Sequence, residues 1–156
     1  PKHILEREVR NYMTMVKERR ATGELDHADS PTVNLQNASH IITDIWWEGN
    51  DLWGEIEVLE DLDQGRNLKG LLKNDVKVGI SSRALGSVQK LSEADVVQED
   101  LYLVCWDIVS EPSTHGAFMM KEAKSFSDDE VRRIMSKSDR IDRAANEILA
   151  LKGKRK

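Results

Sequence analysis

The chain has 156 residues, of which 39% are hydrophobic and 33% charged, a composition typical of a globular domain with one core. Its 23 basic and 28 acidic residues give a formal net charge of −5, which argues against a nucleic-acid or membrane-surface binder, because such proteins carry basic patches. One cysteine excludes a disulfide framework and a cysteine-rich zinc site, and no apolar run is long enough to span a membrane.

The first predicted element is an amphipathic helix over residues 3–20, because apolar residues recur there at helical spacing with charged residues between them. Residues 23–31 follow as a loop by composition. Pro1 stands where an initiator Met is expected, so we expect a fragment or a processed product with further residues upstream.

A β-hairpin is predicted next. Residues 41–47 and 52–58 both alternate between β-branched or aromatic residues and polar ones, and the turn residues 49–51 separate them. Residues 63–74 then carry leucines at helical spacing and predict a short helix.

Two further strands are predicted, over residues 76–82 and 101–109. The second is so poor in polar residues that we expect it to be buried on both faces. The polar stretch 87–100 between them fits no single element.

The C-terminal segment 127–156 is predicted to form a long amphipathic helix, separate from a domain over residues 1–126. Its start matches a capping box, Ser127 to Glu130, and one apolar stripe follows. Residues 128–156 hold 9 basic and 6 acidic residues, unlike the acidic remainder of the chain. This helix is expected to pack on its own domain or on a neighbouring copy, in a homo-oligomer.

His27 is the first candidate for chemistry. It lies in an acidic loop between Asp26 and Asp29, and nearby carboxylates favour the imidazolium form, which suits a general base. From the local sequence alone, a solvated turn is the better explanation, because Asp, Ser, Gly and Pro favour turns.

Ser81 and Ser82 are the candidate nucleophiles, in residues 78–86 (VGISSRALG). A serine hydroxyl needs a base beside it, and backbone amides with Arg83 are candidates to hold an oxyanion or a substrate group. Strand alternation places Ser82 on the apolar face with Ile80, and Ser81 on the opposite face.

Asp107 lies within the most apolar strand. A buried carboxylate is costly unless it is paired, and both a histidine Nδ1–H and the guanidinium of Arg83 are suitable partners. The chain order His27, Ser82, Asp107 is therefore a possible catalytic triad, although a triad is defined by geometry rather than by order.

Three segments together resemble the prohead core protein proteases of T-even-type tailed bacteriophages: residues 21–27 (ATGELDH), 78–86 and 106–113 (WDIVSEPS). The resemblance runs from about residue 21 to about residue 120. It implies a serine endopeptidase related to the herpesvirus assemblins, with an α+β fold made of a small antiparallel β-barrel-like core and flanking helices. Such an enzyme acts in the host cytoplasm, inside the immature phage head, on scaffold and capsid proteins.

By motif match, the resemblance implies that His27 is the general base, Ser82 the nucleophile and Asp107 the third member. His115 is the alternative third member, because assemblins use a second histidine there, and Ser81 is the alternative nucleophile. The acyl-transfer mechanism that follows needs no metal and no organic cofactor, and we expect no nucleic-acid or membrane partner.

The family that the chain resembles cleaves after Glu in Leu/Ile-x-Glu sequences. Self-cleavage is therefore expected after Glu93, in an unassigned polar stretch, and less readily after Glu6, where a helix must first open. A substrate glutamate predicts a basic contact, for which Arg83 and Arg66 are candidates. The competing hypothesis is a non-catalytic capsid or tail assembly module with a related β-barrel.

Overall fold

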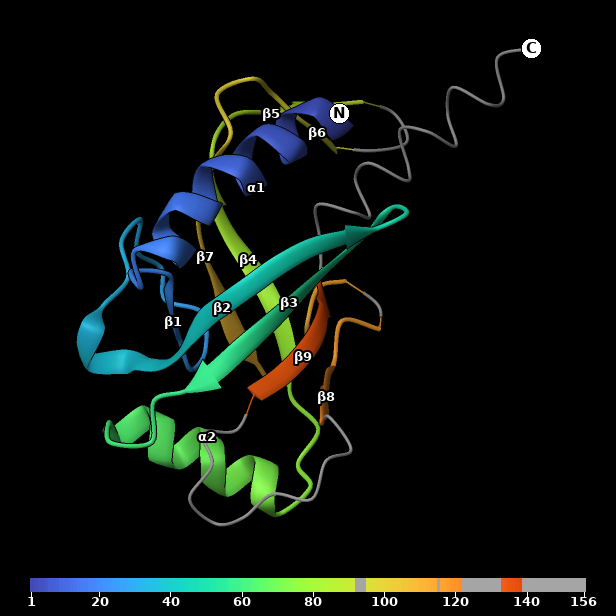
Figure 1. Ribbon diagram of the computed structural model, residues 1–156. Coiled ribbons are helices and arrows are strands. Elements are labelled where there is room, and N and C mark those ends of the chain that lie inside the picture. Colours follow the sequence, from blue (N-terminus) through green and yellow to red (C-terminus); the bar gives the residue numbers. More distant parts are fainter. Residues whose placement is uncertain (92–94, 115, 122–132, 139–156) are drawn as a thin grey trace.

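The computed structural model describes residues 1–91, 95–114, 116–121 and 133–138 (Figure 1). The elements, in chain order, are α1 (Lys2–Lys17), β1 (Thr22–Glu24), a 3-10 turn η1 (Leu35–Asn37), β2 (Ala38–Glu48), β3 (Asp51–Val58), α2 (Asp63–Lys73), β4 (Gly79–Leu85), β5 (Val88–Lys90), β6 (Asp95–Val97), β7 (Tyr102–Val109), β8 (Met119–Lys121) and β9 (Arg133–Ser138).

The strands form one five-stranded sheet and two strand pairs. The large sheet has the order β1-β2-β3-β9-β8, and its strand pairs are antiparallel. Strands β4 and β7 form a second antiparallel sheet, and β5 and β6 a third. The fold is thus mixed, with both helices and antiparallel strands, as the sequence predicts.

Two isolated backbone bridges connect the large sheet with the β4–β7 pair in the described part of the chain. Leu25, just after β1, forms an isolated bridge with Ile108 of β7, and Gly79 of β4 forms one with Phe118, just before β8. Among the described residues these single bridges do not merge the sheets into one closed barrel, so the barrel-like detail of the prediction is not confirmed.

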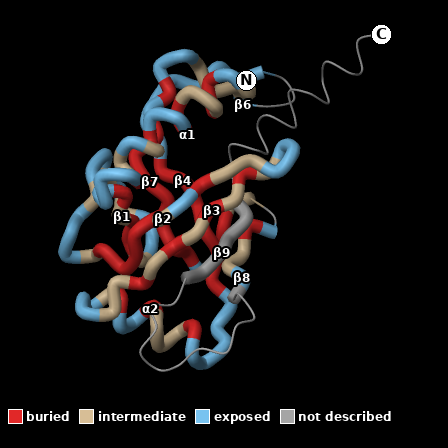
Figure 2. The backbone as a smooth tube through the Cα atoms, viewed as in Figure 1, coloured by how far each residue is buried: buried red, intermediate tan, exposed pale blue. Residues whose placement is uncertain are grey.

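The core lies between the large sheet and the β4–β7 pair, with the helices at opposite ends of the strand layer (Figures 1 and 2). Helix α1 contacts β2 and β7, and its Tyr12 ring meets the Trp106 ring edge-on at 4.7 Å between centroids. Strand β7 is buried at every position after Tyr102, which confirms the expectation of a strand buried on both faces. None of the helices in the described part of the chain is long and apolar enough to cross a membrane.

Helix α1, the β2–β3 hairpin, helix α2 and strand β7 all match the sequence prediction within a few residues. Helix α1 stops at Lys17 rather than at residue 20, because Arg19 takes a left-handed backbone conformation (φ 54°). Strand β4 begins at Gly79, three residues later than predicted, since Val76 still donates its N–H to Leu71 of α2.

Two segments differ more from the prediction. Residues 22–24, largely assigned to a loop, form β1 on the edge of the large sheet. Within 127–156 the structure describes only Arg133–Ser138, and there it has strand β9 on the edge of β3 rather than a helix. The remainder of the helix expected over 127–156 lies outside the described residues.

Candidate active site

The His27 side chain is carried beside β7 by the chain that follows β1. The backbone N–H of Glu24 donates to Oδ1 of Asp107 at 2.9 Å, and the N–H of Asp26 donates to the carbonyl of Ile108 at 2.7 Å. Asp26 has a positive φ of 69°, a conformation that Asp tolerates better than most residues, and the chain turns there. These contacts place the next residue, His27, beside Asp107.

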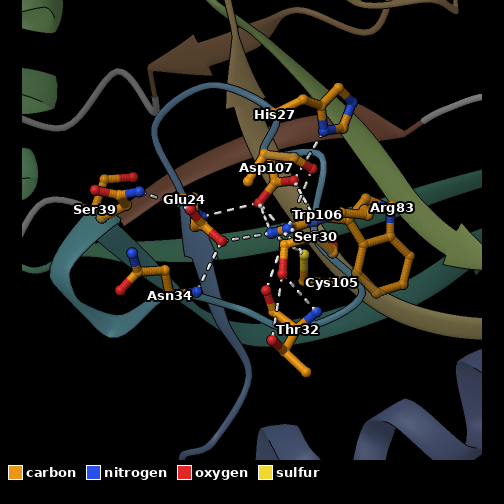
Figure 3. Close-up of polar contacts among 12 residues, drawn as sticks. Glu24, His27, Ser30, Thr32, Asn34, Ser39, Arg83, Cys105, Trp106 and Asp107 are labelled. Atoms are coloured by element: carbon orange, nitrogen blue, oxygen red, sulfur yellow. Dashed lines mark hydrogen bonds and ion pairs between the residues drawn. The ribbon is translucent and has the colours of Figure 1, made fainter.

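Nδ1 of His27 lies 2.8 Å from Oδ2 of Asp107 (Figure 3). The imidazole is 40% exposed, whereas the Asp107 side chain is fully buried. A carboxylate that accepts from Nδ1–H fixes the tautomer and leaves Nε2 for a reacting group. The pair therefore has the geometry of a general base with its orienting acid.

The serine pair lies opposite Asp107 in the β4–β7 ladder. Ser81 pairs with Asp107 and Ser82 pairs with Trp106. Side chains that are directly opposite in an antiparallel pair point to the same face. Ser81 therefore shares the face of Asp107, and Ser82 shares the face of the core residue Trp106, as strand alternation predicts. Both serines are buried.

The segment after β7 folds over the start of β4. A Cβ atom on Gly79 would lie 2.5 Å from the ring of Pro112, so the absence of a side chain at this position allows the close approach. The Ser113 hydroxyl then reaches to 3.4 Å from that of Ser81. This contact adds a second hydroxyl group beside the candidate nucleophile.

Arg83 forms a buried charge cluster with Glu24 and Asp107 behind the histidine (Figure 3). Its Nη2 lies 2.8 Å from the Glu24 carboxylate and 3.2 Å from Oδ1 of Asp107. Burial raises the pKa of Glu24, but hydrogen bonds from Arg83 and from the 34–37 segment outweigh it and hold that pKa below its ordinary value. Burial lowers the pKa of Arg83, but Glu24 and its other partners outweigh burial and raise it.

Cys105 completes the cluster as a neutral group. Its sulfur lies 3.2 Å from Nη2 of Arg83 and 3.3 Å from Oδ1 of Asp107. Burial, with a smaller contribution from Asp107, raises the pKa of the thiol to about 12. A thiol in that state is a poor nucleophile, which leaves the hydroxyl groups as the nucleophile candidates.

The remaining expected residues lie elsewhere. Glu6 is on α1, and Arg66 is on α2, where it pairs with Asp63. His115 and Glu93 lie outside the described residues. In the described part of the chain, no three His, Cys, Asp or Glu side chains are grouped so that they could hold a metal ion.

Two contributors were missed by the sequence reasoning. Neither Glu24 nor Ser113 had an assigned role. Asp107 was expected to pair with either a histidine or Arg83, and the structure has both contacts at once. A glutamate at the end of a short strand gives no signal of an arginine 59 positions away in the sequence.

The chain is similar in sequence to known proteins. A family described as prohead core protein serine protease matches residues 1–128. The prohead core protein protease of Enterobacteria phage T4 is 37% identical over 123 residues, which cover 76% of this chain and 58% of that protein. The chain thus spans less than two thirds of that relative.

The fold is also similar to a solved structure. The bacteriophage T4 capsid assembly protease gp21 superimposes with a TM-score of 0.69 at 35% identity, over 72% of this chain and 71% of that one.

Proposed function

The chain belongs to the prohead core protein serine protease family, and from this premise we propose that it is a serine endopeptidase acting on phage scaffold and capsid proteins. Its place of action would be the immature phage head in the host cell. The observation that carries the proposal is the hydrogen bond between His27 and the buried Asp107, opposite a pair of serines on the neighbouring strand.

The proposed reaction is acyl transfer. A serine Oγ attacks the peptide carbonyl carbon while Nε2 of His27 takes its proton, and Asp107 stays ionised and stabilises the imidazolium. The tetrahedral intermediate collapses when His27 gives the proton to the leaving amine, and the C–N bond breaks. Water, activated by the same imidazole, then hydrolyses the acyl-enzyme and restores the serine.

The proposed nucleophile is a member of the Ser81–Ser82 pair. The motif resemblance favours Ser82, whereas the strand register favours Ser81, because Ser81 is directly opposite Asp107. The contact between the Ser81 and Ser113 hydroxyls also supports Ser81. We favour Ser81 because the register places its side chain on the same strand face as Asp107.

We predict that Ser81→Ala reduces kcat/KM on a peptide with an Ile-x-Glu-Ala site by at least about 1,000-fold, because the covalent step is lost. Ser82→Ala is expected to stay within about 10-fold of the unaltered chain, since it removes only a hydroxyl on the core-facing side. Cleavage is followed by intact mass, and thermal unfolding of both variants controls for folding.

The reverse result, with cleavage retained in Ser81→Ala and lost in Ser82→Ala, would assign the nucleophile to Ser82. If the unaltered chain and both variants all leave the peptide whole, the non-catalytic assembly module becomes the better account of the fold.

We also propose cleavage after Glu in Leu/Ile-x-Glu sequences, including self-cleavage after Glu93. Ile4 and Leu5, which precede Glu6, are buried in α1, so that second site needs local unfolding and should be cut more slowly. Glu93→Gln is predicted to remove the fragment that ends at residue 93, and the time course of intact mass measures it. Glu99→Gln is the matched control, because the residues before it are not Leu/Ile-x. Fragmentation of Glu93→Gln at the unaltered place and rate would contradict this specificity.

Homo-oligomer formation is a further part of the proposal, and it is independent of the chemistry. Sedimentation velocity of the purified chain tests it, and a monomer at all accessible concentrations would contradict it.

A further inference from the structure

We propose that Arg83 and Glu24 are a positioning pair, which holds the loop that carries His27 and the carboxylate of Asp107 in register with each other. The inference rests on the proposed function for its catalytic meaning. The sequence makes Arg83 a candidate for contacting the substrate. In this proposal Arg83 acts on the reaction through His27 instead.

Arg83 reaches from β4 into the middle of the loop formed by residues 25–34. Its Nη1 atom faces three backbone carbonyl groups of this loop: that of Ser30 at 3.0 Å, that of Thr32 at 3.4 Å and that of Ala28 at 3.5 Å. A short polar loop contains little apolar surface to hold it in place. One guanidinium with several fixed donors can order such a loop, whereas a single point charge cannot.

Glu24 holds both ends of the same loop. Its carboxylate accepts from the N–H of Asn34 at 2.9 Å and from the side-chain amide of Asn37 at 3.2 Å, while its own N–H donates to Asp107. The Glu24–Arg83 ion pair at 2.8 Å connects these end contacts to the contacts in the middle. The loop is therefore fixed at its start, its middle and its end by one buried pair.

The same pair fixes the Asp107 carboxylate. Oδ1 accepts from Nη2 of Arg83 at 3.2 Å and from the N–H of Glu24 at 2.9 Å. Oδ2 lies 3.1 Å from Nε of Arg83 and 2.8 Å from Nδ1 of His27. With contacts on both oxygens the carboxylate cannot rotate freely, so its acceptor stays aimed at the imidazole.

The burial of the pair argues against direct substrate contact. The Arg83 side chain is 9% exposed and that of Glu24 is 1% exposed. The Arg83 donors face carboxylates, carbonyls and the Cys105 sulfur inside the protein. A substrate carbonyl or glutamate would have to displace these acceptors to reach the guanidinium.

The net charge of the buried cluster predicts the direction in which each substitution shifts the pH–rate profile. The cluster behind His27 holds two carboxylates and one guanidinium, so its net charge is negative. Asp26 and Asp29 lie on the loop beside His27, and three further titratable groups interact with the Asp107 carboxylate: Cys105 on β7, Tyr12 on α1 and His40 on β2. Burial raises the pKa of Tyr12 and of Cys105 and lowers that of His40, so these three are neutral near neutral pH.

The experiment compares pH–rate profiles of four variants on the Ile-x-Glu-Ala peptide. Glu24→Gln removes one negative charge with little change in shape. The acid limb of the pH–rate profile, where the rate falls as the pH is lowered, is therefore expected to move to lower pH by roughly one unit. Arg83→Gln leaves two carboxylates unbalanced, so its acid limb moves to higher pH. Its kcat also falls about 100-fold with little change in KM, because the loop loses its anchor.

Arg83→Lys separates charge from geometry. The ammonium keeps the acid limb in place, but it cannot reach every acceptor of the guanidinium, so kcat recovers only in part. Arg19→Gln is the matched control for Arg83→Gln, because it makes the same change in net charge at an exposed ion pair with Glu57. Neither the acid limb nor kcat should change in this variant. Acid limbs of Glu24→Gln and Arg83→Gln that coincide with the unaltered profile would overturn the inference.

A second readout does not depend on activity. Nitrogen chemical shifts of the His27 ring, measured by NMR, should report the Nδ1–H tautomer in the unaltered chain and the ordinary Nε2–H tautomer in Arg83→Gln. Retention of the Nδ1–H tautomer in folded Arg83→Gln would overturn the positioning role. If the unaltered chain cleaves no peptide, the proposed function fails, and the tautomer still decides the positioning role by itself.

Discussion

At the scale of single residues, His40 shows how the protein uses a fully buried polar side chain. One ring nitrogen lies 2.9 Å from the Ser39 hydroxyl, and the other lies 3.1 Å from the carbonyl of Trp106. A neutral imidazole satisfies both partners, as an acceptor for the hydroxyl and a donor to the carbonyl. Burial lowers the pKa of His40 to about 4, although the Trp106 carbonyl and Asp107 oppose the shift.

This buried histidine makes stability depend on pH. Because the folded pKa of His40 lies below its ordinary value, the unfolded chain binds the proton more tightly, so acid favours unfolding. The contribution is complete above about pH 6.5 and is lost as the pH falls towards about 4. We predict a loss of about 2 kcal/mol of unfolding free energy from this residue between about pH 7 and about pH 5.

Urea unfolding at the two pH values measures the loss, and His40→Gln is the control because glutamine does not titrate. The difference between the two curves isolates the histidine from the carboxylates. Equal pH dependence in both chains would show that folding does not lower the pKa of His40 and would contradict the prediction.

At the scale of elements, the close approach of β1 to β2 and β7 depends on Gly23. Gly23 is paired with His40 in the β1–β2 ladder. A Cβ atom at this position would lie 2.0 Å from the backbone carbonyl of Trp106 and 2.4 Å from the His40 ring. The lack of a side chain therefore allows β1 to lie close enough to β7 for Glu24 to reach Asp107.

Gly23→Ala is predicted to destabilise the fold by about 3 kcal/mol, because a backbone atom must move to relieve the overlap. Gly70→Ala on α2 is the matched control. Nothing lies within 4 Å of a Cβ atom at Gly70, and alanine favours a helix, so this variant should gain about 0.5–1 kcal/mol. Chemical denaturation measures both changes, and a stability of Gly23→Ala equal to that of the unaltered chain would contradict the close approach of β1 to β7.

At the scale of the whole molecule, the candidate site lies where separate sheets meet. His27 follows the edge strand of the five-stranded sheet, whereas Asp107 and the serines belong to the β4–β7 pair. Contacts between Leu25–Asp26 and Ile108 are the backbone link at this junction. The site therefore depends on how the sheets are joined, and a change that separates them should abolish the site before it unfolds either sheet.

Strand β9 shows that the large sheet extends beyond the family match. That match ends at residue 128, whereas β9 pairs with β3 from Leu52 to Glu57. Strand β9 thereby satisfies backbone groups that an edge strand would leave open.

The sequence by itself determined the elements whose signal is local. Helical spacing gave α1 and α2, alternation gave the hairpin, and an unbroken apolar run gave β7, because each pattern repeats within a few residues. Alternation in β4 also predicted, without reference to a partner strand, that Ser81 and Ser82 lie on opposite faces. The short motifs were sufficient for the family resemblance.

Only the tertiary structure decided which groups meet. His27 and Asp107 are 80 positions apart, and Glu24 and Arg83 are 59 apart, so no local pattern encodes either contact. Strand β9 is a second example of a contact that no local pattern encodes. Its segment has apolar residues at helical spacing, which predicted a helix, but it pairs with β3 as a strand. Pairing partners and buried charge neighbours are properties of the assembled chain, and burial then sets how those charges interact.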